Sequence, residues 1–253
     1  MIGSVALVGA GPGDPELLTL RAAARLRDAD LVLYDALAPA ALLELAPRAR
    51  RFYVGKRAGR HSIDQDGIHR LMIRAARRGQ RVVRLKCGDP FVLGRGGEEC
   101  LALEAAGVPY EVVPGLSSAL AAPALAGIPV THRGAAPAFA VVSGHAAEAY
   151  GPVVDSVAPG ALTLVVLMGL RTRGDLAARL VARGWSPTTP AAIVLGASQD
   201  GEQRWLGTLD ELAGASVDLE LPGVIVIGEV VRLAHVIGAR ADLRAAHSQQ
   251  GLP

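Results

Sequence analysis

Apolar residues occur along the first half of this chain in two alternating patterns. Short runs rich in valine and leucine predict buried strands, whereas apolar residues repeated every three or four positions predict amphipathic helices. The clearest helical repeat places Ile68, Leu71, Met72 and Ala75 on one face. Strands are expected at residues 5–8, 30–34, 51–54, 81–85 and 108–113, and helices at 17–27, 40–45, 63–78 and 100–106. This alternation predicts an α/β domain with a largely parallel sheet.

A second set of elements follows Pro114 and Gly115, which mark the expected domain boundary. Strands are expected at residues 138–142, 163–168, 191–195, 203–206 and 223–227, and helices at 117–126, 172–183 and 230–237. We therefore expect an N-terminal α/β domain over residues 1–114 and a C-terminal α/β domain over residues 115–240. The polar segment 241–253 is expected to form a flexible tail.

Composition and charge remove several classes of protein. Hydrophobic residues make up 51% of the 253 positions, but the longest clean apolar run, residues 161–168, is far too short to span a bilayer. A net charge of +2, without basic runs interleaved with aromatic residues, argues against a nucleic-acid binder. Two cysteines without a CxxC spacing and six scattered histidines predict neither a disulfide scaffold nor a metal site. With no signal-peptide pattern at the N-terminus, we expect a cytoplasmic protein.

The first expected strand leads into a glycine-rich loop, residues 9–15 with the sequence GAGPGDP. A strand, a glycine loop and a helix can open a dinucleotide-binding unit, with Asp35 after the second strand as its ribose acid. Two residues weaken this interpretation, because Asp14 puts a negative charge where a pyrophosphate would bind and Pro12 removes a backbone donor. The loop suits a ligand without phosphates, and an NAD(P)-binding oxidoreductase or regulatory module remains an alternative.

The most informative stretch is residues 84–99, RLKCGDPFVLGRGGEE, which continues directly from an expected strand. Glycines let backbone approach a ligand closely, and the charged side chains must face either water or a partner. Taken alone, this stretch fits both a solvated turn and a binding loop.

Several motifs occur together in an order that resembles the tetrapyrrole methylases. They are VGAGPGDPELLTL at residues 8–20, VGKR at 54–57, DPF at 89–91, GRGGEE at 94–99, VPG at 113–115 and THR at 131–133. Shorter matches at residues 168–169, 203–205, 207–209 and 228–231 extend the resemblance over residues 2–237. Within this family the chain is most similar to the S-adenosylmethionine-dependent uroporphyrinogen-III C-methyltransferases, for which GRGGEE and THR are the most specific elements.

The resemblance implies a two-domain α/β fold, the tetrapyrrole methylase fold, with the active site in the cleft between the domains of a subunit that is usually part of a homodimer. The implied reaction transfers methyl groups from S-adenosylmethionine to C2 and C7 of uroporphyrinogen III, giving precorrin-2 and S-adenosylhomocysteine. That product feeds sirohaem, cobalamin or haem d1 biosynthesis. A later precorrin C-methyltransferase of the cobalamin pathway is the alternative within the family.

The catalytic candidates follow from the substrate and from the resemblance. Eight substrate carboxylates call for arginines on loops, a role that Arg57, Arg95 and Arg133 can fill. Alkylation of a ring carbon also releases a proton, which a carboxylate can accept. By resemblance, the catalytic positions are Asp35 as proton acceptor, Lys56 as proton donor, and Arg95, Glu98 and Arg133 around the tetrapyrrole.

The resemblance also places the cofactor. The matching positions are Pro12, Cys87, Gly88, Asp89, Val92, Ser117, Ser118, Met168 and Ala197. It implies that Asp89 bonds the ribose or amino-acid part of the cofactor and that Met168 packs beside adenine. The chain departs from the family at Cys87, where glycine is usual, at Ser117, where threonine is commoner, and at Ala197, where glycine or alanine occurs. At residue 87 we expect ordinary β-region backbone that tolerates a small side chain.

Overall fold

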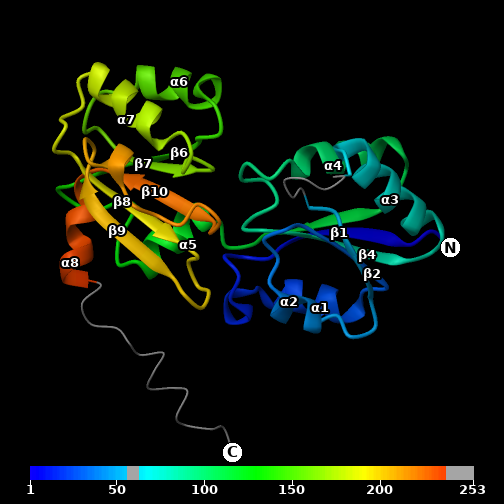
Figure 1. Cartoon of the computed structure of the whole chain (residues 1–253). Coiled ribbons are helices and arrows are strands. Elements are labelled where there is room, and N and C mark those ends of the chain that lie inside the picture. Colours follow the sequence, from blue (N-terminus) through cyan, green and yellow to red (C-terminus); the bar gives the residue numbers. More distant parts are fainter. Residues whose placement is uncertain (56–62, 238–253) are drawn as a thin grey trace, which may run out of the picture. The chain divides into compact units, whose positions relative to one another are not determined.

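The computed structural model describes residues 1–55 and 63–237 and divides the chain into two compact units (Figure 1). Unit 1 is Met1–Ala121 and unit 2 is Ala122–Pro253. Each unit contains a five-stranded sheet among its described residues. The expectations for Lys56, for Arg57 and for a flexible tail at residues 241–253 lie outside the described residues.

Unit 1 is built on a parallel sheet with the strand order β3-β2-β4-β1-β5. Its strands are β1 (Ser4–Gly9), β2 (Leu31–Tyr34), β3 (Arg50–Tyr53), β4 (Arg81–Lys86) and β5 (Tyr110–Val113). After their first residues, β1 and β4 are buried throughout, as expected for central strands of a sheet covered on both faces. The parallel α/β fold expected from the sequence is confirmed.

Helices cover both faces of this sheet (Figure 1). On one face, α1 (Leu20–Asp28) and α2 (Ala40–Glu44) pack Leu26 and Leu42 into a core that includes Val8. On the other, α3 (Gln65–Arg77) and α4 (Gly96–Ala105) pack Met72 and Leu103 into a core that includes Leu7. Adjacent residues of β1 thus serve opposite cores, because side chains alternate across a strand.

Two helices of unit 1 begin three or more residues from their expected starts, whereas α3 begins at Gln65, two residues after the expected Ile63. α1 begins at Leu20 rather than Leu17, because Pro15–Leu17 form a separate 3-10 turn, η1, and the Thr19 hydroxyl accepts the Ala22 N–H at 3.2 Å. α4 begins at Gly96 rather than Cys100, directly after Arg95 in a left-handed conformation with φ 59°. Both glutamates of GRGGEE therefore lie in the first turn of α4, where the helix dipole favours negative charge.

Unit 2 contains a mixed sheet with the order β6-β7-β10-β8-β9, in which β6 and β7 are parallel and the other neighbours antiparallel. Its strands are β6 (Phe139–Ser143), β7 (Thr163–Leu167), β8 (Pro190–Leu195), β9 (Gln203–Thr208) and β10 (Gly223–Ile227). The helices and 3-10 segments are α6 (Ala147–Ser156), α7 (Arg173–Ala182), η2 (Leu212–Gly214), η3 (Glu229–Leu233) and α8 (Ala234–Ile237). α5 (Ser118–Leu125) begins in unit 1 and ends in unit 2.

The core of unit 2 lies where α6 and α7 pack on the sheet, with Tyr150 and Trp185 among its buried residues. The sequence did not predict α6, because Gly151 and Pro152 interrupt its helical pattern. Within the described ranges, no helix is both long enough and apolar enough to cross a membrane.

Candidate active site

The carboxyl ends of the parallel strands in unit 1 bring three glycines into backbone contact. An added Cβ on Gly9, which ends β1, would lie 2.5 Å from the Gly115 nitrogen and 2.7 Å from the Gly88 carbonyl oxygen. Gly88 also exchanges two backbone hydrogen bonds with Gly11, at 2.8 and 3.2 Å. We call Gly9, Gly88 and Gly115 the glycine crossing. Open α/β sheets bind ligands at this edge, where backbone without side chains can approach them closely.

Asp89 ties two of these loops together. One carboxylate oxygen accepts the Phe91 N–H at 2.8 Å, and the other accepts the Gly115 N–H at 3.1 Å. The loop after β4 is therefore fixed to the loop after β5. An acceptor positioned in this way can still receive a further hydrogen bond, because each carboxylate oxygen has two lone pairs.

The remaining cofactor candidates of unit 1 lie in these loops. Gly88 takes φ +65°, and a Cβ there would lie 3.4 Å from the Ser118 nitrogen. The neighbouring Ser117 is buried, and its hydroxyl accepts the Ala119 N–H at 3.3 Å at the start of α5. Pro12 is buried and Val92 is partly buried. Unit 1 thus holds Cys87, Gly88, Asp89, Ser117 and Ser118 close to the glycine crossing.

Unit 2 holds the other two cofactor candidates, Met168 and Ala197. Met168 directly follows β7, and Ala197 lies two residues after the end of β8. Both strands run antiparallel to β10, which lies between them. Both residues therefore lie at the same edge of the unit 2 sheet. Met168 is 53% exposed and has φ 60°, an uncommon backbone conformation for a residue with a side chain. An exposed apolar side chain held in this conformation is consistent with a ligand contact.

Asp35 follows β2 at the carboxyl edge of unit 1 and is anchored by an arginine from the neighbouring strand. Its side chain is 31% exposed, and its Oδ1 accepts a hydrogen bond from Nη2 of Arg84 at 2.7 Å. Arg84 is 3% exposed and also donates from Nε to the fully buried Glu99 at 3.0 Å. Asp35 is therefore the exposed end of a buried chain of charges.

Lys86 completes this buried set, which we call the ion network: Asp35, Arg84, Lys86 and Glu99. The Lys86 ammonium lies 3.0 Å from Oε2 of Glu99 and is 5% exposed. Burial and the neighbouring Arg84 lower the pKa of Lys86, against the opposing effect of Glu99. Burial alone would lower the pKa of Arg84 too, but Glu99 and Asp35 outweigh it and raise that pKa, so the guanidinium stays charged.

Sequence reasoning missed the roles of Arg84, Lys86 and Glu99. These charges were expected to face water or a partner, and they are buried as partners of one another. Arg84 and Lys86 are two residues apart on β4 and so share one face of the sheet. Two cations on the same face of a strand that is otherwise buried were the available signal, because such charges require a buried counter-ion.

Arg95 and Glu98 pair with each other at the start of α4. Arg95 donates from Nε to Oε1 and from Nη2 to Oε2 of Glu98, at 2.8 and 2.6 Å, in an exposed fork. The hydrogen bonds from Arg95 hold the pKa of Glu98 below its usual value. Glu98 is therefore a weaker proton acceptor than a free glutamate. Arg133 lies exposed in unit 2, beside the bridge between His132 and Ala136.

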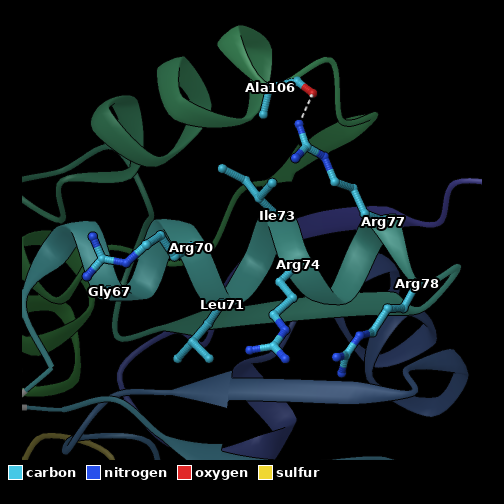
Figure 2. Close-up of a pocket in the computed structure, with 8 residues that line it drawn as sticks. All are labelled: Gly67, Arg70, Leu71, Ile73, Arg74, Arg77, Arg78 and Ala106. Atoms are coloured by element: carbon cyan, nitrogen blue, oxygen red, sulfur yellow. Dashed lines mark hydrogen bonds between the residues drawn. The ribbon is translucent and has the colours of Figure 1, made fainter.

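None of the expected site residues is among the described residues that line a groove along α3. In Figure 2, its arginine side chains spread around apolar Leu71 and Ile73, and Arg77 donates to the Ala106 carbonyl at 3.3 Å. The lining residues are Gly67, Arg70, Leu71, Ile73, Arg74, Arg77, Arg78 and Ala106. The ionisable groups among these described lining residues are guanidiniums, which do not exchange protons at neutral pH.

Comparison with known proteins decides the family. The sequence pattern of the family described as Tetrapyrrole (Corrin/Porphyrin) Methylases matches residues 4–213. The chain belongs to the tetrapyrrole methylases.

Two curated relatives of this methylase are named siroheme synthase. The protein from Actinobacillus pleuropneumoniae serotype 7 is 47% identical over 235 residues, which cover 92% of this chain and 48% of that protein. The protein from Pseudomonas aeruginosa strain UCBPP-PA14 is 46% identical over 249 residues, which cover 95% of this chain and 53% of that protein. The methylase thus spans about half the length of these relatives.

Solved structures support the same fold. The uroporphyrin-III C-methyl transferase from Thermus thermophilus, complexed with S-adenosyl homocysteine, is 45% identical with a TM-score of 0.78, over 91% of this chain and 100% of that one. A cobalt precorrin-4 methyltransferase is 26% identical with a TM-score of 0.77, over 90% of this chain and 95% of that one. The two-sheet α/β architecture is therefore that of the tetrapyrrole methylases.

The environment of Cys87 predicts how fast its thiol is alkylated. Burial raises the pKa of this thiol above its usual value, with a hydrogen bond to Ser118 opposing the shift. Because the thiolate is the reactive form, alkylation near pH 8 should be slower than for free cysteine. S-adenosylhomocysteine should slow it further. Mass spectrometry of iodoacetamide-treated Cys100→Ser protein measures both effects.

The Cys87→Gly variant provides the control. The left-handed backbone lies at Gly88, and Cys87 is not among the residues with positive φ in the described ranges. We therefore expect S-adenosylhomocysteine affinity to change by less than about tenfold in this variant. An alkylation rate that does not change with the ligand would contradict the expectation that Cys87 borders the cofactor.

Proposed function

We propose that this methylase transfers methyl groups from S-adenosylmethionine to C2 and C7 of uroporphyrinogen III, giving precorrin-2. The observation that carries this proposal is the carboxyl edge of unit 1, where the glycine crossing and the anchored carboxylate of Asp35 lie at the ends of neighbouring strands. The similarity to the Thermus thermophilus enzyme supports the same reaction and the same cofactor.

The glycine crossing fits the cofactor as a place where backbone can line a ligand. A sulfonium cofactor supplies an activated methyl group, so the protein mainly orients the reactants and excludes water. We propose that the loops at Pro12, Gly88, Asp89 and Ser118 hold the cofactor. Met168 and Ala197 remain our proposed cofactor contacts on the basis of the resemblance. Asp89 is positioned to accept a hydroxyl or ammonium hydrogen while it joins two loops.

The ionisable groups can then be assigned roles toward the tetrapyrrole. We assign Asp35 as the proton acceptor, because it is partly exposed and fixed by one oxygen, whereas Arg95 occupies both oxygens of Glu98. Arg95 and Arg133 are exposed guanidiniums suited to the substrate carboxylates. Lys56 remains our proposed proton donor.

An NAD(P)-binding function is disfavoured by the loop after β1. The Asp14 carboxylate accepts the Glu16 N–H at 2.9 Å and caps the 3-10 turn that follows. A pyrophosphate would need this backbone donor and would meet a negative charge there. A later precorrin methyltransferase has less support, because the cobalt precorrin-4 enzyme is 26% identical and the uroporphyrin-III enzyme 45%.

Calorimetry tests the cofactor assignment directly. S-adenosylhomocysteine should bind with a stoichiometry of one per chain, whereas NAD should give no heat of binding. Incubation with S-adenosylmethionine and uroporphyrinogen III should then yield a product two methyl groups heavier by mass spectrometry. NAD binding without S-adenosylhomocysteine binding would reject the proposal, and methylation of a later precorrin alone would select the alternative substrate.

We also propose a homodimer in the cytoplasm, which the relationship to the family supports. Sedimentation velocity across a range of protein concentrations measures the dimer, and fractionation of cells measures the location.

A further inference from the structure

Arg84 is held at all three of its guanidinium nitrogens. Nε donates to Glu99 at 3.0 Å, Nη1 to the Leu85 carbonyl at 3.1 Å and Nη2 to Asp35 at 2.7 Å. A planar guanidinium with three fixed partners cannot rotate without breaking a hydrogen bond. The direction from which Arg84 approaches Asp35 is therefore set by the other two partners.

Glu99 is the partner that gathers the buried donors. Its Oε1 accepts hydrogen bonds from Arg84, from Lys86 at 3.1 Å and from Gln65 of α3 at 3.2 Å. The residue is 0% exposed, so these groups take the place of water around its charge. Glu99 thereby joins α4, which carries it, to β4 and α3.

The charges of the ion network balance, with two carboxylates against two cations. Burying ions costs free energy that their attraction often fails to recover, so such a set is weak evidence for a stabilising role. Here the set ends at one partly exposed carboxylate, Asp35, which lies at the ligand edge of the sheet. Orientation of that carboxylate is an effect that an apolar core could not supply.

We propose that Glu99, with Lys86 as its counter-charge, is a positioning residue that acts through Arg84 to fix the Asp35 carboxylate for proton acceptance. The inference rests on the proposed role of Asp35. Glu99 is fully buried and is linked to Asp35 through Arg84, so it should influence the chemical step and leave cofactor affinity unchanged.

The Glu99→Gln variant tests this inference, because it keeps the shape of the side chain and removes its charge. We expect kcat per folded enzyme to fall about tenfold or more, since a small displacement of a catalytic group slows the chemical step strongly. KM for uroporphyrinogen III and Kd for S-adenosylhomocysteine should stay within about twofold of the wild-type values. Cys100→Ala, a change at the next residue of α4, is the control and should keep wild-type kcat.

A double-mutant cycle with Asp35→Asn separates positioning from any independent role. If Glu99 acts through Asp35, adding Glu99→Gln to Asp35→Asn should lower kcat by less than about twofold. Losses that multiply would overturn the inference, as would wild-type kcat in folded Glu99→Gln beside an impaired Asp35→Asn. Wild-type kcat in Asp35→Asn would instead overturn the proposed role of Asp35.

Should Glu99→Gln fail to fold, Glu99→Asp carries the same test. This variant keeps the charge that balances Lys86 but withdraws the carboxylate from Arg84 by one methylene group. We expect kcat to fall below the wild-type value, and we expect this loss to be absent on the Asp35→Asn background. Wild-type kcat in Glu99→Asp, or a loss that persists on that background, would overturn the inference.

Discussion

Replacing Asp35 with asparagine should lower the kcat of methylation by about two to four decades, the range over which a positioned proton acceptor acts. The amide oxygen can still accept from Arg84, whose Nη2 lies 2.7 Å from Oδ1 in the wild-type protein. The side chain can no longer take up a proton at neutral pH. Turnover, measured in single-turnover assays, should therefore fall much more than the affinity for substrate or cofactor, measured by calorimetry.

Asp30→Asn is a matched control for this experiment. Asp30 precedes β2 and pairs with Arg81 at the start of β4, at 3.1 Å, so it has the same type of partner on the same neighbouring strand as Asp35. It lies at the opposite, amino-terminal edge of the sheet. The variant should remain folded, because exposed ion pairs contribute little to stability. We expect its kcat within about twofold of wild type, because Asp30 lies at the edge opposite Asp35. An Asp35→Asn effect on KM alone would make Asp35 a binding residue.

Gly9→Ala should destabilise the protein by about 3 kcal/mol or more and abolish S-adenosylhomocysteine binding. The three atoms nearest the added methyl group would be backbone atoms of Gly115 and Gly88, none of which can rotate away. Unit 1 must separate β1 from the loops after β4 and β5 to admit it. Scanning calorimetry should show a fall in Tm of about 6–12 °C, and ligand titration should show no binding.

Gly214→Ala measures the generic effect of the same substitution. Gly214 is exposed at the end of η2, has no atom within 4 Å of an added Cβ and is not among the glycines with positive φ. The Tm of the Gly214→Ala variant should stay within about 2 °C of wild type, because a surface substitution of this kind changes stability little. A Gly9→Ala protein with wild-type Tm and affinity would show that the glycine crossing opens easily.

Much of unit 1 could be predicted from sequence because its elements depend on local signals. β1 and β4 are short valine- and leucine-rich runs bounded by glycines, and α3 shows a clear apolar face over three turns. The residues at which the helices begin were harder to predict. Thr19 and Arg95 set the beginnings of α1 and α4 through their backbone geometry and capping, which apolar spacing does not report.

The ion network could not be predicted with the same confidence from the chain alone. Residues 84, 86 and 99 look like solvated charges in sequence, and only the packing of α4 against β4 shows that they neutralise each other. The resemblance singled out Asp35 as a candidate proton acceptor, but the orientation of its carboxylate depends on Arg84, 49 positions later in the chain. Pairings over such separations are properties of the fold, and local patterns do not contain them.

The glycine crossing also limits how the protein can be redesigned. Gly9 and Gly115 have no room for a side chain at this point of contact, and Gly88 has a positive φ that side chains rarely adopt, so random libraries that include these three positions should contain many destabilised variants. If the proposed cofactor site is right, diversity aimed at accepting altered methyl donors belongs instead at neighbours that already carry side chains, such as Ser117 and Ser118 beside Gly88. The backbone of the glycine crossing would then stay unchanged, and only the side chains around it would be varied.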